Sequence, residues 1–113
     1  MQPRRIEILP SFEAALKDLS PDLQEKVEDA LVKFVDRSAD NALRPEPKRG
    51  LDGVWSFRVS KGYRAFYVKE RDAEGAKYHL FHVGHHDDYR MVRKRVPRIT
   101  ITAGFRSYRK GAA

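Results

Sequence analysis

Residues 54–68, which read VWSFRVSKGYRAFYV, decide the fold of this chain. Polar and apolar side chains alternate with a period of two on either side of a short polar segment, as in strands with one buried face. The segment Ser60-Lys61-Gly62 is a turn signal, because glycine adopts a positive φ without a steric penalty. If a three-residue turn pairs Val59 with Tyr63, the stretch forms a β-hairpin. One face of that hairpin then carries Trp55, Phe57, Val59, Tyr63 and Tyr67.

The same pairing puts two arginines opposite each other. Arg58 on the first strand faces Arg64 on the second, on the side away from the aromatic residues. Like charges across a strand pair destabilise a sheet unless an anion joins them. The pair therefore indicates either an anion site or two guanidinium groups that splay into solvent or pair with acidic residues. A two-residue turn would break this pairing altogether.

Upstream of the hairpin, the sequence predicts a strand followed by two helices. Arg4–Leu9 is a short apolar run that Pro10 halts, and we expect it at an edge of the sheet. Ser11 suits the N-cap of a first helix, in which apolar residues recur at helical spacing. Ser20 caps a second helix that runs to about Asp36. We expect this helical hairpin to cover one face of the sheet with its apolar stripe.

Downstream of the hairpin, Lys77–Val83 predicts a third antiparallel strand. Residues 38–53 read as a connection, in which Pro45 and Pro47 favour extended backbone. Near the C-terminus, Arg93-Lys94-Arg95 extends a short helix, and residues 99–103 alternate as in a strand. The predicted fold class is α+β: a single small domain with an N-terminal strand, a helical hairpin and a three-stranded antiparallel meander.

Composition limits the classes of protein to which the chain can belong. Its 113 residues suffice for one domain with one core. Cysteine is absent, which excludes disulfides, thiolate metal sites and a thiol nucleophile. No apolar run reaches the roughly 20 residues that cross a bilayer, and no apolar signal core follows Arg4 and Arg5. We therefore expect a cytoplasmic protein.

Positive charge is concentrated towards the C-terminal end. Residues 1–88 carry 15 Lys and Arg against 16 Asp and Glu, whereas residues 89–113 carry eight and none. Such a cationic patch favours a polyanion, with an affinity that falls as salt rises. A basic tail that only aids solubility, or an acidic partner protein, would account for the same composition.

A dense polar cluster follows the third predicted strand. Residues 81–90 read FHVGHHDDYR, so an apolar run ends at Gly84 and two imidazoles, two carboxylates, a phenol and a guanidinium follow it. Imidazole is the side chain whose ordinary pKa lies nearest neutrality, and loops on a rigid scaffold often carry functional groups. The cluster therefore indicates either a site of proton transfer or a surface loop in which Asp87 or Asp88 caps the next helix.

Three motifs in this order resemble the RelE/ParE superfamily of bacterial type II toxins. They are residues 50–59 (GLDGVWSFRV), 62–67 (GYRAFY) and 83–89 (VGHHDDY). The leucine–glycine entry, the Gly-Tyr-Arg start of the middle strand and the Val-Gly end of the last strand are typical of that group. The resemblance covers residues 4–92. It implies a toxin domain over residues 1–92, with residues 93–113 as a basic C-terminal extension of the same domain.

The resemblance implies an endoribonuclease that cuts mRNA, commonly at the ribosome, and that a cognate antitoxin protein holds silent. Cleavage of this kind needs no metal or other cofactor, because the 2′-OH of the substrate attacks the neighbouring phosphorus. The reaction requires a base for the 2′-OH, an acid for the departing 5′-oxygen and cations against the charge of the phosphorane.

The matching positions imply roles for individual residues. RelE-type members carry lysines on the first central strand, where this chain has Arg58, a poor base because guanidinium stays protonated near neutrality. The Gly-x-His spacing after the last strand is closer to the YafQ-like branch and implies that His86 is the acid or base. Arg64 and Arg58 are then phosphate clamps, and Tyr89 is a stacking or proton-relay group. The implied catalytic set is His86, Arg64, Arg58, Tyr89 and His85. The implied RNA-binding set is Lys48, Arg49, Lys61, Arg90, Arg93, Lys94 and Arg95.

Two other classes stay open. A ParE-like member would share the scaffold but bind DNA gyrase instead of cutting RNA, and it would need no acid–base group, so the adjacent imidazoles argue against it. A zinc site formed by His82, His85 and His86 with Asp87 or Asp88 is the other reading. That set reproduces no established ligand spacing and His82 lies on the strand, so the sequence predicts no metal site.

Overall fold

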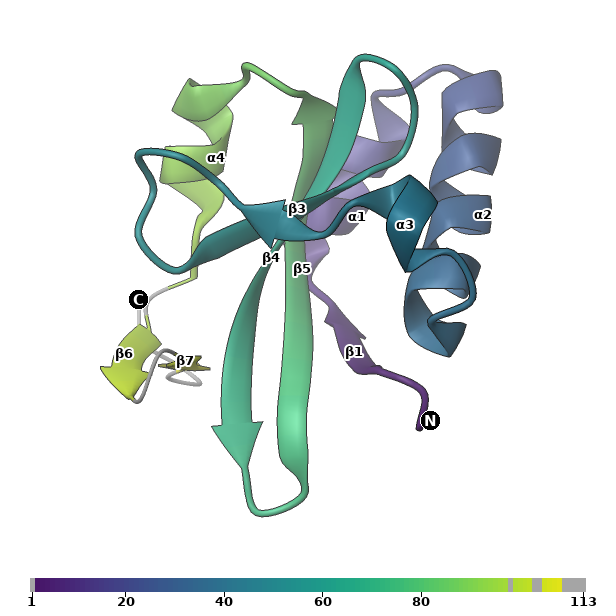
Figure 1. The fold of residues 1–113 in the computed structure, drawn as a ribbon. Helices are drawn as coiled ribbons and strands as arrows, with labels where there is room; N and C mark the ends of the chain where they lie inside the picture. The colour runs from purple at the N-terminus through teal and green to yellow at the C-terminus, as the bar shows by residue number, and fades with distance from the viewer. Residues whose placement is uncertain (1, 98, 103–104, 109–113) are drawn as a thin grey trace.

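Five strands form one sheet in the order β1-β5-β4-β3-β2 in the computed structural model, which describes residues 2–97, 99–102 and 105–108 (Figure 1). The strands are β1 (Arg5–Ile8), β2 (Glu46–Pro47), β3 (Val54–Arg58), β4 (Tyr63–Asp72) and β5 (Gly75–His85). The helices are α1 (Pro10–Lys17), α2 (Pro21–Asp36), α3 (Asp40–Leu43) and α4 (Tyr89–Arg95). A separate two-stranded sheet consists of β6 (Ile99–Thr102) and β7 (Phe105–Tyr108). This order confirms the predicted α+β fold of N-terminal strand, helical hairpin and antiparallel meander.

The β3–β4 hairpin has the predicted register. The Val59 N–H donates to the Tyr63 carbonyl at 3.0 Å, so three residues form the turn. Arg58 therefore pairs with Arg64 across the two strands. Because side chains alternate across a strand, the apolar face that packs against the helices leaves both arginines on the opposite face.

The helical hairpin covers one face of the sheet, as predicted. Phe34 of α2 stacks on Phe57 of β3 with ring centroids 4.3 Å apart, and Trp55 is half-buried at the margin of this core. A second core lies on the opposite face, where Val92 of α4 packs among apolar residues of the sheet. Figure 1 shows α4 and α2 on opposite sides of the sheet. The arginine face is therefore the one that α4 partly covers.

The two edges of the sheet differ in how well the sequence predicts them. β1 lies at one edge, as expected, and runs parallel to β5, with Ile8 paired to Leu80. β2 forms the other edge within the segment that was predicted as a connection, and its Pro47 pairs with Trp55. Proline lacks an N–H and is tolerated at an edge. A strand of two residues shows no periodicity, so no alternation identifies it.

The prediction that Ser11 caps the first helix is wrong. Leu9 is the N-cap and Pro10 is the first helical residue, where its missing N–H costs nothing. The Ser11 hydroxyl instead donates to the Phe81 carbonyl at 2.5 Å, which ties α1 to β5. Ser20 caps α2, as predicted.

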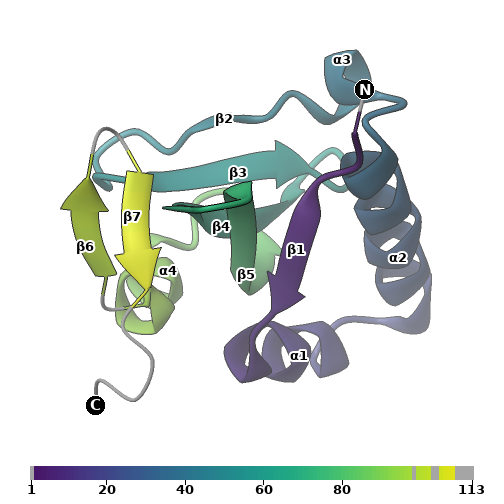
Figure 2. The same cartoon turned by 90° about the horizontal axis from the view of Figure 1, so that it is seen from below.

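The C-terminal segment contains a helix and a small two-stranded hairpin. α4 includes Arg93-Lys94-Arg95, and β6 covers most of the strand predicted over residues 99–103. β7 lies beside β4 (Figure 2). Position 103, with residues 98, 104 and 109–113 of the predicted extension, lies outside the described residues. Within the described ranges, no helix is long and apolar enough to cross a membrane.

Candidate functional site

A polar cavity of about 270 Å³ opens on the sheet face away from the helical hairpin. β4 contributes Arg64, the loop after β5 contributes His86, and α4 contributes its first residue, Tyr89. The other lining residues come from β2, the segment after it and β3: Glu46, Pro47, Lys48, Arg49 and Ser56. The fold thus brings together five of the residues that the sequence predicts for an RNA site.

Two arginines on this face each have a buried guanidinium nitrogen without a hydrogen-bond partner among the described residues. These atoms are Nη1 of Arg64 and Nε of Arg58. Arg64 pairs with Arg58 on one side and with Gly84 of β5 on the other, so both neighbouring strands fix its backbone. Arg58 does not itself line the cavity. Buried polar groups are normally hydrogen-bonded, and guanidinium forms charge-assisted bonds to phosphate. Arg64 can therefore bind an anion in the cavity, and Arg58 adds positive charge beside it.

His86 is held by its backbone and leaves its ring accessible. The His86 N–H donates to the Gly62 carbonyl at 2.9 Å, and the His86 carbonyl accepts a hydrogen bond from the Lys48 ammonium. The side chain is 51% exposed. An accessible imidazole on a fixed backbone can donate a proton to a bound ligand or accept one from it.

Solved structures of toxins share this architecture. The E. coli toxin RelE, a mutant in the free state, matches with a TM-score of 0.57 and 17% identity over 83% of this chain and 94% of RelE. The E. coli DinJ–YafQ toxin–antitoxin complex matches with a TM-score of 0.55 and 13% identity, over 78% of this chain and 98% of the matched chain. The YoeB/ParE toxin from Agrobacterium tumefaciens gives 0.54 and 16%, over 72% and 97%. The chain has the RelE/ParE toxin fold. No family model and no curated protein matches its sequence.

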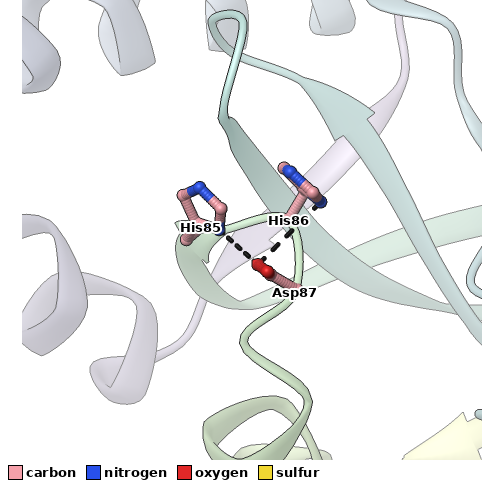
Figure 3. A group of neighbouring side chains, drawn as sticks. All are labelled: His85, His86 and Asp87. Carbon is pink, nitrogen blue, oxygen red and sulfur yellow. Dashed lines mark hydrogen bonds and ion pairs between the residues drawn. The ribbon is translucent and has the colours of Figure 1, made fainter.

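In this RelE/ParE fold, His85 lies outside the cavity. Its Nδ1 hydrogen-bonds the Asp87 carboxylate, and its ring meets the Tyr63 ring edge-on with centroids 5.8 Å apart. The hydrogen bond from His85 lowers the pKa of Asp87, so this carboxylate is ionised at neutral pH. Nδ1 of His86 lies 3.9 Å from the same carboxylate oxygen (Figure 3). The two imidazoles thus share one anionic neighbour.

Tyr89, at the N-terminal end of α4, lies close to two cationic side chains. The Lys48 ammonium is 4.4 Å from the centroid of the Tyr89 ring, and the guanidinium carbon of Arg93 is 5.7 Å from it. Both distances allow cation–π attraction. Asp88 N-caps α4 and so fixes Tyr89 as the first helical residue. An aromatic ring in a cationic cavity is a surface on which a nucleic-acid base can stack.

The remaining predicted RNA-binding cations do not line the cavity. Those that are exposed are Lys61, Arg90, Arg93 and Lys94. Arg95 is different, because its Nη1 donates to the Ser11 carbonyl at 3.1 Å and lies 3.3 Å from Nδ1 of His82. Arg95 therefore holds α4 against α1, which does not fit the RNA-binding role predicted for it.

The sequence does not predict the contact between the buried His82 and the half-buried Asp88. Nε2 of His82 hydrogen-bonds Asp88 at 3.0 Å, and burial lowers the pKa of His82. Gly84 makes this contact possible, since a Cβ there would lie 3.0 Å from Nε2 of His82 and 3.1 Å from Oδ2 of Asp88. A β-bulge between Phe66 and Tyr67 shifts the register with β5, so simple alternation could not place His82.

Two lining residues with polar side chains were also missed, for different reasons. Ser56 lies two residues before Arg58 on β3 and shares its face, so the period of the strand was a usable signal. Glu46, which brings a carboxylate to the cavity, lies on the two-residue strand β2, and no sequence pattern marks it.

Proposed function

We propose that this chain is the toxin of a type II toxin–antitoxin system and that it cleaves mRNA in the cytoplasm without a metal ion. The observation that carries the proposal is the convergence of Arg64, His86 and Tyr89 on one cavity, beside guanidinium nitrogens that lack a partner among the described residues. The RelE/ParE fold, with toxins and toxin–antitoxin complexes among its structural neighbours, supports the same class of protein.

In the proposed reaction the substrate supplies its own nucleophile. The 2′-OH of one nucleotide attacks the adjacent phosphorus, an O2′–P bond forms and the P–O5′ bond breaks. The products are a 2′,3′-cyclic phosphate and a 5′-OH. One proton leaves the 2′-OH and one proton reaches the departing O5′. His86 carries out one of these transfers, because its accessible imidazole lies in the cavity.

Arg64 and Arg58 supply the electrostatic part of the catalysis. Negative charge builds up on the non-bridging phosphate oxygens as the phosphorane forms, and fixed donors aimed at those oxygens lower the barrier. Both residues lie on adjacent central strands and bring fixed positive charge to this face of the sheet, and Arg64 lines the cavity itself. Tyr89 stacks on a base next to the scissile bond and thereby helps to align the 2′-OH.

The cations around this centre bind the flanking RNA. Lys48 and Arg49 line the cavity, and the exposed cations of the β3–β4 turn and α4 extend the positive surface. Contacts of this type bind phosphates without reading sequence. The mRNA is presented by the ribosome, and a cognate antitoxin protein silences the toxin, as the DinJ–YafQ toxin–antitoxin complex suggests by analogy.

Induced expression in a bacterial host tests this proposal. We expect the wild-type protein to arrest growth and to degrade bulk mRNA before DNA supercoiling changes, and Arg64→Ala to relieve both effects. Arg5→Ala is the matched control, since Arg5 is a solvent-accessible arginine that pairs with Asp72 at the far side of the sheet. Growth arrest with altered supercoiling and intact mRNA would replace the nuclease by a gyrase inhibitor.

A further inference from the structure

Three side chains in the loop that joins β5 to α4 form a compact set of metal-ligating groups. His85, His86 and Asp87 each offer one ligand atom, and these atoms all lie within 4.8 Å of one another. All three residues are exposed. Figure 3 shows both imidazoles directed towards the Asp87 carboxylate. An ion could therefore reach the set directly from solvent.

The distances between the ligand atoms suit a single ion. Zinc binds imidazole nitrogen and carboxylate oxygen at about 2.0–2.2 Å, which places two ligands of a tetrahedral site about 3.4 Å apart. Nδ1 of His86 is 3.9 Å from Oδ1 of Asp87, and Nδ1 of His85 hydrogen-bonds that same oxygen. The two imidazole rings are adjacent, with centroids 4.4 Å apart. Small side-chain rotations would bring all three atoms onto one centre.

The backbone of this loop is already held in place. The His86 N–H donates to Gly62 at 2.9 Å, the Asp88 N–H donates to the His85 carbonyl at 3.0 Å, and the Tyr89 N–H donates to the Asp87 carbonyl at 2.9 Å. Each of the three residues therefore has its main chain fixed by a hydrogen bond. Binding to a pre-organised loop avoids most of the entropic cost of ordering it.

We propose that His85, His86 and Asp87 bind a divalent late transition metal of the zinc class. Two imidazoles and one carboxylate match zinc, whereas magnesium and calcium take oxygen ligands almost exclusively. Three protein ligands leave a coordination position for water. Coordination through Nδ1 leaves the proton of each neutral imidazole on Nε2. This inference revises the zinc site that the sequence analysis rejected, because His85, His86 and Asp87 bring their ligand atoms together without His82.

Nearby positive charge opposes the binding of a cation. The Lys48 ammonium hydrogen-bonds the His86 carbonyl, and the chain carries a formal net charge of +7. Lys48 therefore weakens the site by direct repulsion. Replacing it with the uncharged Lys48→Met variant removes this repulsion, so we expect zinc to bind that variant more tightly than the wild type.

Metal binding also has a consequence for catalysis, which rests on the proposed function. An ion on Nδ1 of His86 orients the ring towards Asp87 and withdraws the imidazole from proton transfer. Zinc is thus expected to inhibit the metal-free nuclease reversibly, and a chelator is expected to restore cleavage.

Calorimetric titration of the full, tag-free chain with zinc chloride tests the binding site directly. We expect one ion per chain and no binding of magnesium. His85→Ala, His86→Ala and Asp87→Asn should each weaken zinc binding by more than the ~10–100-fold that loss of an outer-sphere partner typically costs. Asp29→Asn is the matched control, because Asp29 is an exposed carboxylate on α2, and its affinity should equal that of the wild type.

Proton NMR of the wild-type chain tests the same site without any variant. The sequence contains four histidines, so zinc should shift the ring signals of His85 and His86 and leave those of the buried His79 and His82 in place. Shifts confined to His79 or His82, unchanged affinity in Asp87→Asn, or the absence of zinc binding would each overturn the proposal. Zinc binding to a chain that never cleaves RNA would instead refute only the nuclease function.

Discussion

His86 and His85 are adjacent in the chain but have different surroundings. His86 lines the cavity with Arg64, whereas His85 hydrogen-bonds Asp87 and faces Tyr63. We expect His86→Ala to slow RNA cleavage about 10²–10⁴-fold, the usual contribution of an acid–base group, and His85→Ala to have a much smaller effect. Rates are measured with excess enzyme on a defined RNA.

Since both side chains are half exposed, neither substitution creates a buried cavity, and urea unfolding should give near wild-type stability. Cleavage at the wild-type rate by His86→Ala would remove it from the mechanism.

A substitution at Arg64 is expected to affect RNA cleavage and the stability of the fold in opposite directions. Its buried Nη1 has no partner within the described ranges, and an unsatisfied buried donor costs about 1–3 kcal/mol. Arg64→Met keeps most of the side-chain volume, so we expect it to raise the free energy of unfolding by up to about 1 kcal/mol while RNA cleavage is lost. Arg4→Met is the control, because the Arg4 guanidinium bonds Asp40 and the Phe34 carbonyl, and its loss should destabilise the fold. A destabilised Arg64→Met variant would show that Arg64 serves the fold.

At the scale of elements, the end of β5 and the start of α4 are joined through Gly84. A Cβ at this position would press on His82 and on Asp88, the N-cap of α4. We expect Gly84→Ala to cost about 1–3 kcal/mol, as overpacking typically does, and to slow cleavage by displacing Tyr89. Thermal unfolding and the cleavage assay measure both effects. Gly62→Ala is the matched control, because its nearest contact would be an ordinary 3.4 Å to the His85 ring. Equal stability of the two variants would contradict the packing argument.

Elements whose polar and apolar residues alternate regularly were predictable from the sequence. Elements that depend on tertiary contacts were not. The register of residues 54–68 follows from alternation and a turn, and it correctly pairs Arg58 with Arg64. The bulge opposite Phe66 and the two-residue strand β2 have no periodic signal, so Glu46 and the His82–Asp88 contact could not be foreseen. The meeting of Lys48 with Tyr89 likewise depends on how a loop and a helix pack, 41 positions apart.

At the scale of the whole molecule, Arg4 fastens the N-terminal segment to the end of the helical hairpin. Its hydrogen bonds to Asp40 hold the pKa of that carboxyl below its ordinary value, and Arg37 acts in the same direction. The folded state therefore binds fewer protons than the unfolded state at acidic pH, so this contribution is complete above the ordinary pKa and disappears as pH falls through the lowered one. We expect Asp40→Asn to be less stable than wild type at neutral pH and equally stable in strong acid, as measured by urea unfolding across a pH series. A constant difference would exclude this linkage.

The charge asymmetry of the chain predicts how RNA binding responds to salt. Each phosphate neutralised on single-stranded nucleic acid contributes about 0.7 to the slope of log affinity against log salt. Replacing Arg98, Arg109 and Lys110 with glutamine should therefore lower the magnitude of that slope by up to about 2.

The control variant replaces Lys17, Lys26 and Lys33, which are exposed on the helical hairpin across the sheet from the cavity. It removes the same charge and should leave most of the slope intact. The ligand is a 2′-O-methyl RNA, which cannot be cleaved because its nucleophile is blocked. Equal slopes in the two variants would show that only net charge matters and that the C-terminal cations do not contact RNA.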